Sequence, residues 1–217
     1  MNVVITGANR GIGLELTKIY VSRGCNVFAL CRRASDELKK LGAEIYEDVD
    51  VRQIDKFEHD IKDIDLLINN AGLFLDENID QIDDAAIERI RNQFEVNALA
   101  PLRVVAKFLV NLSSGAKICM VTSRMGSIAD NTSGGRYGYR MSKCALNMAT
   151  KSISLDLKDR KISAGVFHPG WVQTEMTGRT GNLSASESAE LLVKRFDELN
   201  LKNSGSFWHC NGELLPW

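Results

Sequence analysis

The chain has 217 residues and a formal net charge of −1, with 44% hydrophobic and 25% charged residues. This length suits one domain with a substantial core, and the composition excludes disordered and fibrous classes. A near-neutral chain has no overall attraction for nucleic acid or an anionic membrane, and no run of about 18 apolar residues occurs. We therefore expect no nucleic-acid binding and no membrane insertion. The five scattered cysteines form no CxxC pair, which indicates reduced thiols in a cytoplasmic protein.

Short β-branched runs alternate with longer helical patterns along the chain. The predicted helices start near residue 12 and at Ser35, and span 53–62, 84–112, 139–159 and 186–200. The predicted strands are 3–6, 27–31, 44–46, 66–69, 117–122 and 163–167, with an edge strand near 205–212. This alternation predicts an α/β fold over 1–217, a single-domain, Rossmann-type doubly wound parallel sheet with helices on both faces.

The first predicted strand runs into a glycine turn, in which residues 6–13 read Thr-Gly-Ala-Asn-Arg-Gly-Ile-Gly. Glycines let the backbone approach a ligand, and free N–H groups at a helix N-terminus stabilise a phosphate. The turn therefore predicts a pyrophosphate site for a dinucleotide, although the spacing differs from the standard G-x-G-x-x-G. A tight turn between strand and helix is the structural alternative.

The end of the second predicted strand, Leu30-Cys31-Arg32-Arg33, bears on the choice of cofactor. A carboxylate there would bind the ribose 2′-hydroxyl of NAD, whereas a cation accommodates the 2′-phosphate of NADP. No carboxylate is present, and Arg10 of the glycine turn can approach the same place, so we expect NADP (NADPH) rather than NAD, with Arg32 as its main contact. The alternative is that Arg32 and Arg33 are solvated charges that open a loop.

Tyr139 and Lys143 stand at positions i and i+4 of a predicted helix, so they share one face. A free tyrosine titrates near about 10, and Lys143 with an oxidised nicotinamide would stabilise its phenolate and lower this pKa. Tyr139 would then exchange a proton with a carbonyl or alcohol as general acid/base. Ser123, after the predicted strand 117–122, would hydrogen-bond the reacting oxygen, with Thr122 as the alternative. A solvated Lys143 on an ordinary helix is the competing interpretation.

Asn97 stands four residues before Pro101 within the predicted helix 84–112. Because proline has no N–H, the carbonyl of Asn97 would lack its helical partner and be free to hold a water at a kink. A plain kinked helix is the alternative.

Taken in order, these segments resemble the short-chain dehydrogenase/reductase family. The motifs that carry the resemblance are Thr-Gly-x-x-x-Gly-x-Gly at 6–13, Asn-Asn-Ala-Gly at 69–72, Ser-x-x-Gly at 123–126, Tyr-x-x-x-Lys at 139–143 and Pro-Gly-x-Val-x-Thr at 169–174. The short chain, the run Ser-Arg-Met-Gly-Ser-Ile and the Pro-Trp ending resemble the C-factor-like and sniffer-like subgroup, near the carbonyl reductases. Ser123 and Tyr139 are a few residues further apart than is usual in the family, which enlarges the loop between them.

The resemblance implies a catalytic tetrad of Asn97, Ser123, Tyr139 and Lys143, in which Asn97 holds a water that links the lysine to solvent. An Asp-Val element would lie beside the adenine; Asp50 is favoured over the competing register at Asp48. The complete predicted cofactor site is Gly7, Asn9, Arg10, Gly11, Ile12, Gly13, Arg32, Asp50, Val51, Asn70, Ala71, Gly72, Tyr139, Lys143, Pro169, Gly170, Val172 and Thr174.

The function that follows is an NADP-dependent oxidoreductase, which transfers a hydride between nicotinamide and a carbonyl or alcohol substrate without a metal. A cofactor-binding signalling or redox-sensing protein with little turnover is the alternative. The expected substrate loops are approximately 73–82, 126–138 and 175–185. The family's use of its long helices for packing implies a homodimer or homotetramer.

Overall fold

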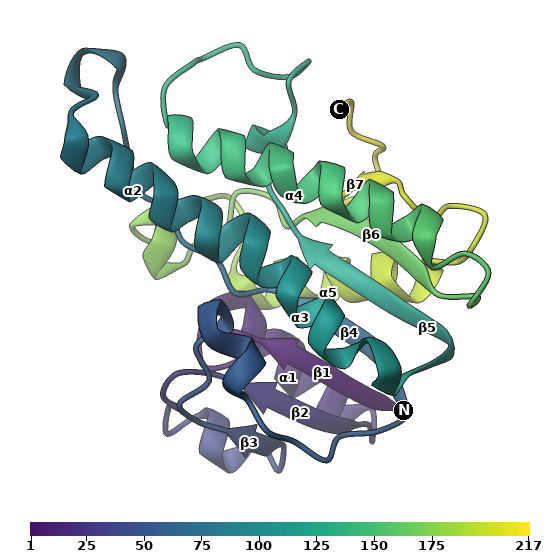
Figure 1. The fold of residues 1–217 in the computed structure, drawn as a ribbon. Helices are drawn as coiled ribbons and strands as arrows, with labels where there is room; N and C mark the ends of the chain where they lie inside the picture. The colour runs from purple at the N-terminus through teal and green to yellow at the C-terminus, as the bar shows by residue number, and fades with distance from the viewer.

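A seven-stranded parallel sheet organises the protein, and the computed structural model describes all 217 residues (Figure 1). The strand order is β3-β2-β1-β4-β5-β6-β7, and every neighbouring pair is parallel. The doubly wound fold expected from the sequence is therefore confirmed. The strands are β1 (Asn2–Thr6), β2 (Asn26–Leu30), β3 (Glu44–Tyr46), β4 (Ile64–Asn69), β5 (Leu112–Val121), β6 (Ser163–His168) and β7 (Phe207–His209).

Helices cover both faces of this sheet (Figure 1). One face carries α1 (Gly11–Ser22) and α5 (Ala185–Glu198), and the other carries α2 (Asp84–Phe94), α3 (Ala100–Phe108) and α4 (Tyr137–Asp156). Successive side chains of a strand point to opposite faces, so Val3 and Ile5 join one apolar core while Val4 joins the other. This double burial explains why the central strands are apolar without alternation. Among the helices, none combines the length and the apolar character that a membrane-spanning segment requires.

The strand order reverses between β1 and β4. The chain leads from β1 outward through β2 to β3, and from β4 in the opposite direction through β5 and β6 to β7. The turns that follow β1 and β4 therefore diverge, and a crevice opens at their carboxyl ends. This edge of the sheet carries the candidate site.

Two predicted helices are wrong. The helix expected from Ser35 is a single 3₁₀ turn, Leu38–Lys40, whose Leu38 N–H donates to the Ser35 hydroxyl at 3.2 Å. The helix expected over 53–62 is replaced by two short 3₁₀ turns within Val51–Lys56, which meet at a kink at Gln53 and are followed by irregular chain. Its apolar residues fill the core beside α3, where the ring of Phe57 lies 6.4 Å from that of Phe108. These apolar residues pack from a loop and do not form the apolar face of a helix.

The long helix predicted over 84–112 is interrupted at Asn97, as Pro101 led us to expect. A π-helical turn, Glu95–Leu99, joins α2 to α3, and the Ala100 N–H donates to the Glu95 carbonyl. Pro101 has no N–H to continue the ordinary ladder, and the wider turn accommodates this break. Asn97 is fully buried in this turn.

Candidate active site

A cavity of about 1070 Å³ lies at the carboxyl ends of the strands. Most of the predicted cofactor residues line it: Gly7, Asn9, Arg10, Gly11, Ile12, Arg32, Asp50, Val51, Asn70, Ala71, Gly72, Tyr139, Lys143, Pro169 and Thr174. Gly13, Gly170 and Val172 lie outside this lining, as do Asn97 and Ser123 of the predicted tetrad. The lining also includes Cys31, Val49, Arg52, Leu73, Asn92, Val96, Val121, Thr122, Gln173, Glu175, Met176 and Arg179.

The turn after β4 holds the glycine turn in place. The Asn70 side-chain amide donates to the carbonyls of Thr6 and Gly7, at 3.1 and 3.2 Å. In return, the backbone N–H groups of Asn70 and Ala71 donate to the Thr6 hydroxyl at 3.0 and 3.2 Å. The glycine turn and the turn after β4 therefore form one hydrogen-bonded unit. Asn70 stabilises the predicted pyrophosphate site and also lines the cavity.

Gly13 makes this close packing possible. A Cβ atom built at Gly13 would lie 2.2 Å from the Gly7 carbonyl oxygen and 2.5 Å from the Asn70 side-chain nitrogen. Gly7 itself has φ +66°, a conformation that favours glycine. The spacing G-x-x-x-G-x-G therefore serves two purposes: a left-handed turn at its start, and close approach of helix to strand at its end.

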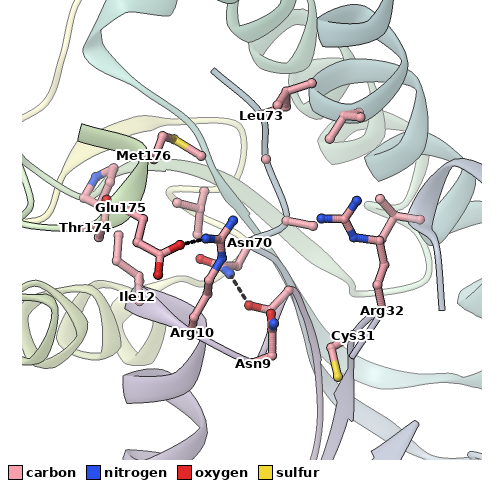
Figure 2. Close-up of a pocket in the computed structure, with 18 of the residues that line it drawn as sticks. Asn9, Arg10, Ile12, Cys31, Arg32, Asn70, Leu73, Thr174, Glu175 and Met176 are labelled. Carbon is pink, nitrogen blue, oxygen red and sulfur yellow. Dashed lines mark hydrogen bonds and ion pairs between the residues drawn. The ribbon is translucent and has the colours of Figure 1, made fainter. Parts of the chain in front are cut away.

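The two arginines expected near the 2′-phosphate have different surroundings. Arg10 pairs with Glu175, which follows β6, whereas Arg32 is exposed and forms no ion pair. Figure 2 shows Arg10 turned toward Glu175, with Arg32 across the cavity beyond Asn70. Arg32 is therefore a cation without an ion-pair partner that lines the cavity after β2. No sequence signal pointed to Glu175, because its partner is far away in the chain.

The Asp-Val element meets the cavity through Asp50, the register favoured from the sequence. Asp48, the competing residue, does not line the cavity. Both carboxylate oxygens of Asp50 accept from Arg52, at 3.1 Å from its Nε, and this arginine lowers the pKa of Asp50. The carboxylate is thus oriented by a residue that the sequence analysis did not single out.

Tyr139 and Lys143 lie one turn apart on α4 and both line the cavity. The Lys143 ammonium donates to the Val121 carbonyl at 3.0 Å and lies 5.9 Å from the centre of the Tyr139 ring. Burial lowers the pKa of Lys143 to about 8. Burial also raises the pKa of Tyr139 to about 12, although the Ser123 hydroxyl acts in the opposite direction. The direction is opposite to the lowering by Lys143 expected from the sequence, because desolvation dominates the pKa of Tyr139, and the phenol is protonated at neutral pH.

Ser123 caps the 3₁₀ turn Arg124–Gly126 that follows β5, and its hydroxyl accepts from the Met125 N–H at 3.2 Å. The alternative hydroxyl, that of Thr122, donates to the Asn147 side-chain oxygen at 2.7 Å. The Asn147 amide also donates to the Gly126 carbonyl at 3.2 Å. Asn147 on α4 therefore holds the loop that carries Ser123, and the Thr122 hydroxyl is engaged in the same structural contact.

The side chain of Asn97 binds the loop after β4. Its oxygen accepts from the Leu73 N–H at 2.8 Å, and its amide donates to the Leu73 carbonyl at 2.7 Å. The amide also lies 3.0 Å from the Ser142 hydroxyl of α4. These contacts account for the side chain, and the backbone carbonyl stays the predicted water ligand, since Pro101 offers it no N–H.

The loop after β6 closes one side of the cavity with a short turn, Glu175–Thr177. The Thr177 hydroxyl donates to the Val172 carbonyl at 2.6 Å, which holds this turn against the strand end. Met176 lines the cavity from here and Phe74 packs edge-on against Tyr139, with ring centres 5.1 Å apart. Phe74 is thus an apolar neighbour of the tyrosine, and Met176 is an apolar part of the cavity wall.

Comparisons with known proteins agree with this geometry. Residues 1–183 match the family model described as short chain dehydrogenase. The chain is 45% identical to "C-signal" of Myxococcus xanthus over 157 residues, which cover 71% of this chain and 93% of that protein. It superposes on the carbonyl reductase Sniffer of Drosophila melanogaster with a TM-score of 0.90 and 29% identity, covering 100% and 99% of the two chains.

A second solved structure contains a cofactor. It is a carbonyl reductase from Pseudomonas aeruginosa PAO1 in complex with NADP, which has 32% identity and a TM-score of 0.84 over 100% of this chain and 99% of that one. The family match covers most of the chain, and the sheet order is the one that the resemblance implied. The chain belongs to the short-chain dehydrogenase/reductase family, among the C-signal-like and sniffer-like carbonyl reductases, and is a nicotinamide-dependent oxidoreductase.

Proposed function

We propose that this protein is an NADPH-dependent carbonyl reductase in which Tyr139 donates the proton. The observation that carries the proposal is the arrangement on α4, where Tyr139 and Lys143 face the cavity that the glycine turn also lines. A tyrosine that is protonated at neutral pH suits the donor of a reduction, since a general acid must hold its proton before the reaction.

The cavity fits a phosphorylated dinucleotide. The glycine turn contributes Gly7 and Gly11 to the cavity wall, and Arg32 offers a guanidinium without an ion-pair partner where a 2′-phosphate would lie. When bound, the nicotinamide would supply the hydride. Asp50 and Val51 would border the adenine, and Asn70, Ala71 and Gly72 would border the ribose.

The other three residues of the tetrad would each have a separate role. Ser123 would hydrogen-bond the substrate oxygen as negative charge develops on it. Lys143, charged below about pH 8, would anchor the ribose hydroxyls and return a proton to Tyr139. Asn97 would supply the backbone carbonyl that holds a water between Lys143 and solvent. The loops 73–82, 126–138 and 175–185 would shape the substrate pocket, and the first and last of them contribute Leu73, Met176 and Arg179 to the cavity lining.

Removal of the Arg32 guanidinium is expected to weaken NADPH binding by about 10- to 100-fold. A hydrogen bond to a charged group contributes about 1.5–3 kcal/mol, and each 1.4 kcal/mol corresponds to about a tenfold change in affinity. The Arg32→Ala variant should therefore lose its preference for NADPH while its NADH affinity stays near that of wild type. Fluorescence titration with both nucleotides measures this.

Arg33→Ala is the matched control, because Arg33 carries the same charge at the next position and does not line the cavity. It should keep the preference for NADPH. An unchanged preference in Arg32→Ala would remove Arg32 from this role and point to Arg10.

The assay of the proposed function is NADPH oxidation by the wild-type protein against a panel of aldehydes and quinones. Turnover with one or more of these carbonyls is the expected result. The competing function is a signalling or redox-sensing protein, which the 45% identity to "C-signal" favours. Tight NADPH binding without turnover on any carbonyl would support that alternative, although pure binding gives no reason for Tyr139 and Lys143 to face the cavity together.

A further inference from the structure

Glu77 is a buried carboxylate that the mechanism does not use. It lies in the loop after β4, only 2% exposed, and forms no ion pair with any lysine or arginine. An ionised group is costly to bury unless hydrogen bonds compensate for the lost water. The hydrogen-bond partners of the Glu77 carboxylate therefore indicate its role.

All the acceptor atoms of Glu77 face hydrogen-bond donors. One carboxylate oxygen accepts from the side-chain amide of Gln93 on α2 at 2.6 Å, and the other accepts from the Gly138 N–H of α4 at 3.0 Å. Its backbone carbonyl accepts from the Arg136 N–H at 2.9 Å. Gln93 is oriented in turn, because its own oxygen accepts from the Leu75 N–H at 2.9 Å.

The N-terminus of α4 has no cap of its own. Arg136, the residue before the helix, is in the left-handed conformation and makes no capping hydrogen bond, and the first turn contains no acidic residue. The first N–H groups of a helix need acceptors, and a negative charge there also stabilises the helix dipole. The carboxylate of Glu77, in the loop after β4, supplies an acceptor for the Gly138 N–H and a negative charge near this end of α4.

This cap lies directly beside the proposed proton donor. Tyr139 is the residue after Gly138, and Phe74 of the same loop packs against its ring. Gly138 is also pressed against α2, since a Cβ atom there would lie 2.4 Å from the Gln93 amide nitrogen. The loop after β4, α2 and the first turn of α4 are therefore closely packed around Gly138, the residue that precedes Tyr139.

We infer that Glu77 is a positioning residue for Tyr139: its carboxylate caps α4 from the loop after β4 and fixes the direction of the phenol through Gly138. The inference rests on the proposed function in one respect, namely that the phenol of Tyr139 is the proton donor.

The role requires a group that only accepts hydrogen bonds. A glutamine at position 77 can accept from Gly138 with its oxygen, but its NH₂ group then faces the NH₂ group of Gln93. If Gln93 turns over to accept, its NH₂ group faces the Leu75 N–H instead. One pair of opposed donors remains in either case. A carboxylate at both positions, in contrast, would place two like charges in contact.

Exchanging the two residues resolves the conflict. In the double variant Glu77→Gln/Gln93→Glu, the new amide at position 77 donates to the new carboxylate at position 93. The oxygen of that amide accepts from Gly138, and the second oxygen of the carboxylate accepts from Leu75. We expect kcat for carbonyl reduction to fall by about 10- to 100-fold in Glu77→Gln and in Gln93→Glu, since small misplacement of a catalytic group has effects of this size. The double variant should recover most of the loss.

Two further measurements separate positioning from simple loss of structure. The dissociation constant for NADPH should change little in all three variants, because neither Glu77 nor Gln93 lines the cavity. Amide hydrogen exchange at Gly138 should accelerate in both single variants and slow again in the double variant. Ile162→Val, which removes one buried methylene group just before β6 and outside the cavity lining, is the control for stability and should retain kcat.

Single variants that keep kcat and the wild-type exchange rate at Gly138 would overturn the inference, as would a folded double variant with no recovery. The exchange measurement does not depend on turnover. If the wild-type protein reduced no carbonyl, the proposed function would fail, while the exchange pattern would still decide whether Glu77 caps α4.

Discussion

Replacing Tyr139 with phenylalanine is expected to lower kcat for NADPH-dependent carbonyl reduction by about 10²- to 10⁴-fold, the usual contribution of general acid catalysis. The change removes only the hydroxyl group, and the ring keeps its edge-on contact with Phe74. Burial keeps that hydroxyl protonated, with a pKa of about 12, so a protonated donor is present across the neutral range. Its loss leaves Ser123 to hold a carbonyl oxygen that receives no proton.

Steady-state kinetics, together with NADPH titration and thermal unfolding, measure this prediction. The nucleotide affinity and the unfolding temperature should stay close to wild type, since the fold and the glycine turn are untouched. Tyr137→Phe is the matched control: it makes the same change two residues earlier on α4, at a residue that does not line the cavity. Full activity in Tyr139→Phe would assign the proton to another group.

Substituting alanine for Gly13 is expected to destabilise the protein by about 1–3 kcal/mol, the usual cost of overpacking, and to weaken NADPH binding strongly. The added methyl group would lie 2.2 Å from the Gly7 carbonyl oxygen, and backbone cannot yield as a flexible side chain can. The glycine turn must therefore move away from α1. Its hydrogen bonds with Asn70 would be disturbed by the same displacement.

Gly72→Ala is the control for this effect, because it adds the same methyl group in the neighbouring turn after β4, where there is more space. The nearest atoms there, the Asn97 side-chain oxygen and the Lys143 ammonium, lie at 3.4 and 3.7 Å, close to ordinary contact. Chemical denaturation should show a smaller loss of stability in Gly72→Ala than in Gly13→Ala. Equal losses in the two variants would contradict the assignment of Gly13 to close helix–strand packing.

The sheet could be predicted from the sequence because its strands are short, apolar and buried on both faces. Every predicted strand is present, although β5 begins at Leu112, five residues earlier than expected. The helix predictions failed where the apolar residues belong to a packed loop. Phe57, for example, lies in irregular chain that packs beside α3, and it is not part of an apolar face of a helix. Periodicity alone cannot distinguish such a packed loop from a short helix.

The motifs located most of the cavity, since all except Tyr-x-x-x-Lys, which is in α4, lie at the carboxyl end of a strand, and parallel strands end at one edge. The tetrad is less directly exposed to the cavity than its motifs suggested. Asn97 and Ser123 do not line it, because Asn97 binds the backbone of Leu73 and Ser123 caps a tight turn. A motif specifies a residue and its place in the chain, but not which of its neighbours the side chain engages.

The fold class, the family, and the position of the glycine turn and of the pair Tyr139 and Lys143 could be inferred from the chain alone, because they depend on local pattern and on order along the chain. The ion pair of Arg10 with Glu175, the lack of such a partner at Arg32, and the capping of α4 by Glu77 became evident only in the folded protein. These contacts join residues far apart in the chain. They depend on how the loops pack against one another at the carboxyl edge of the sheet, which no local pattern of residues specifies.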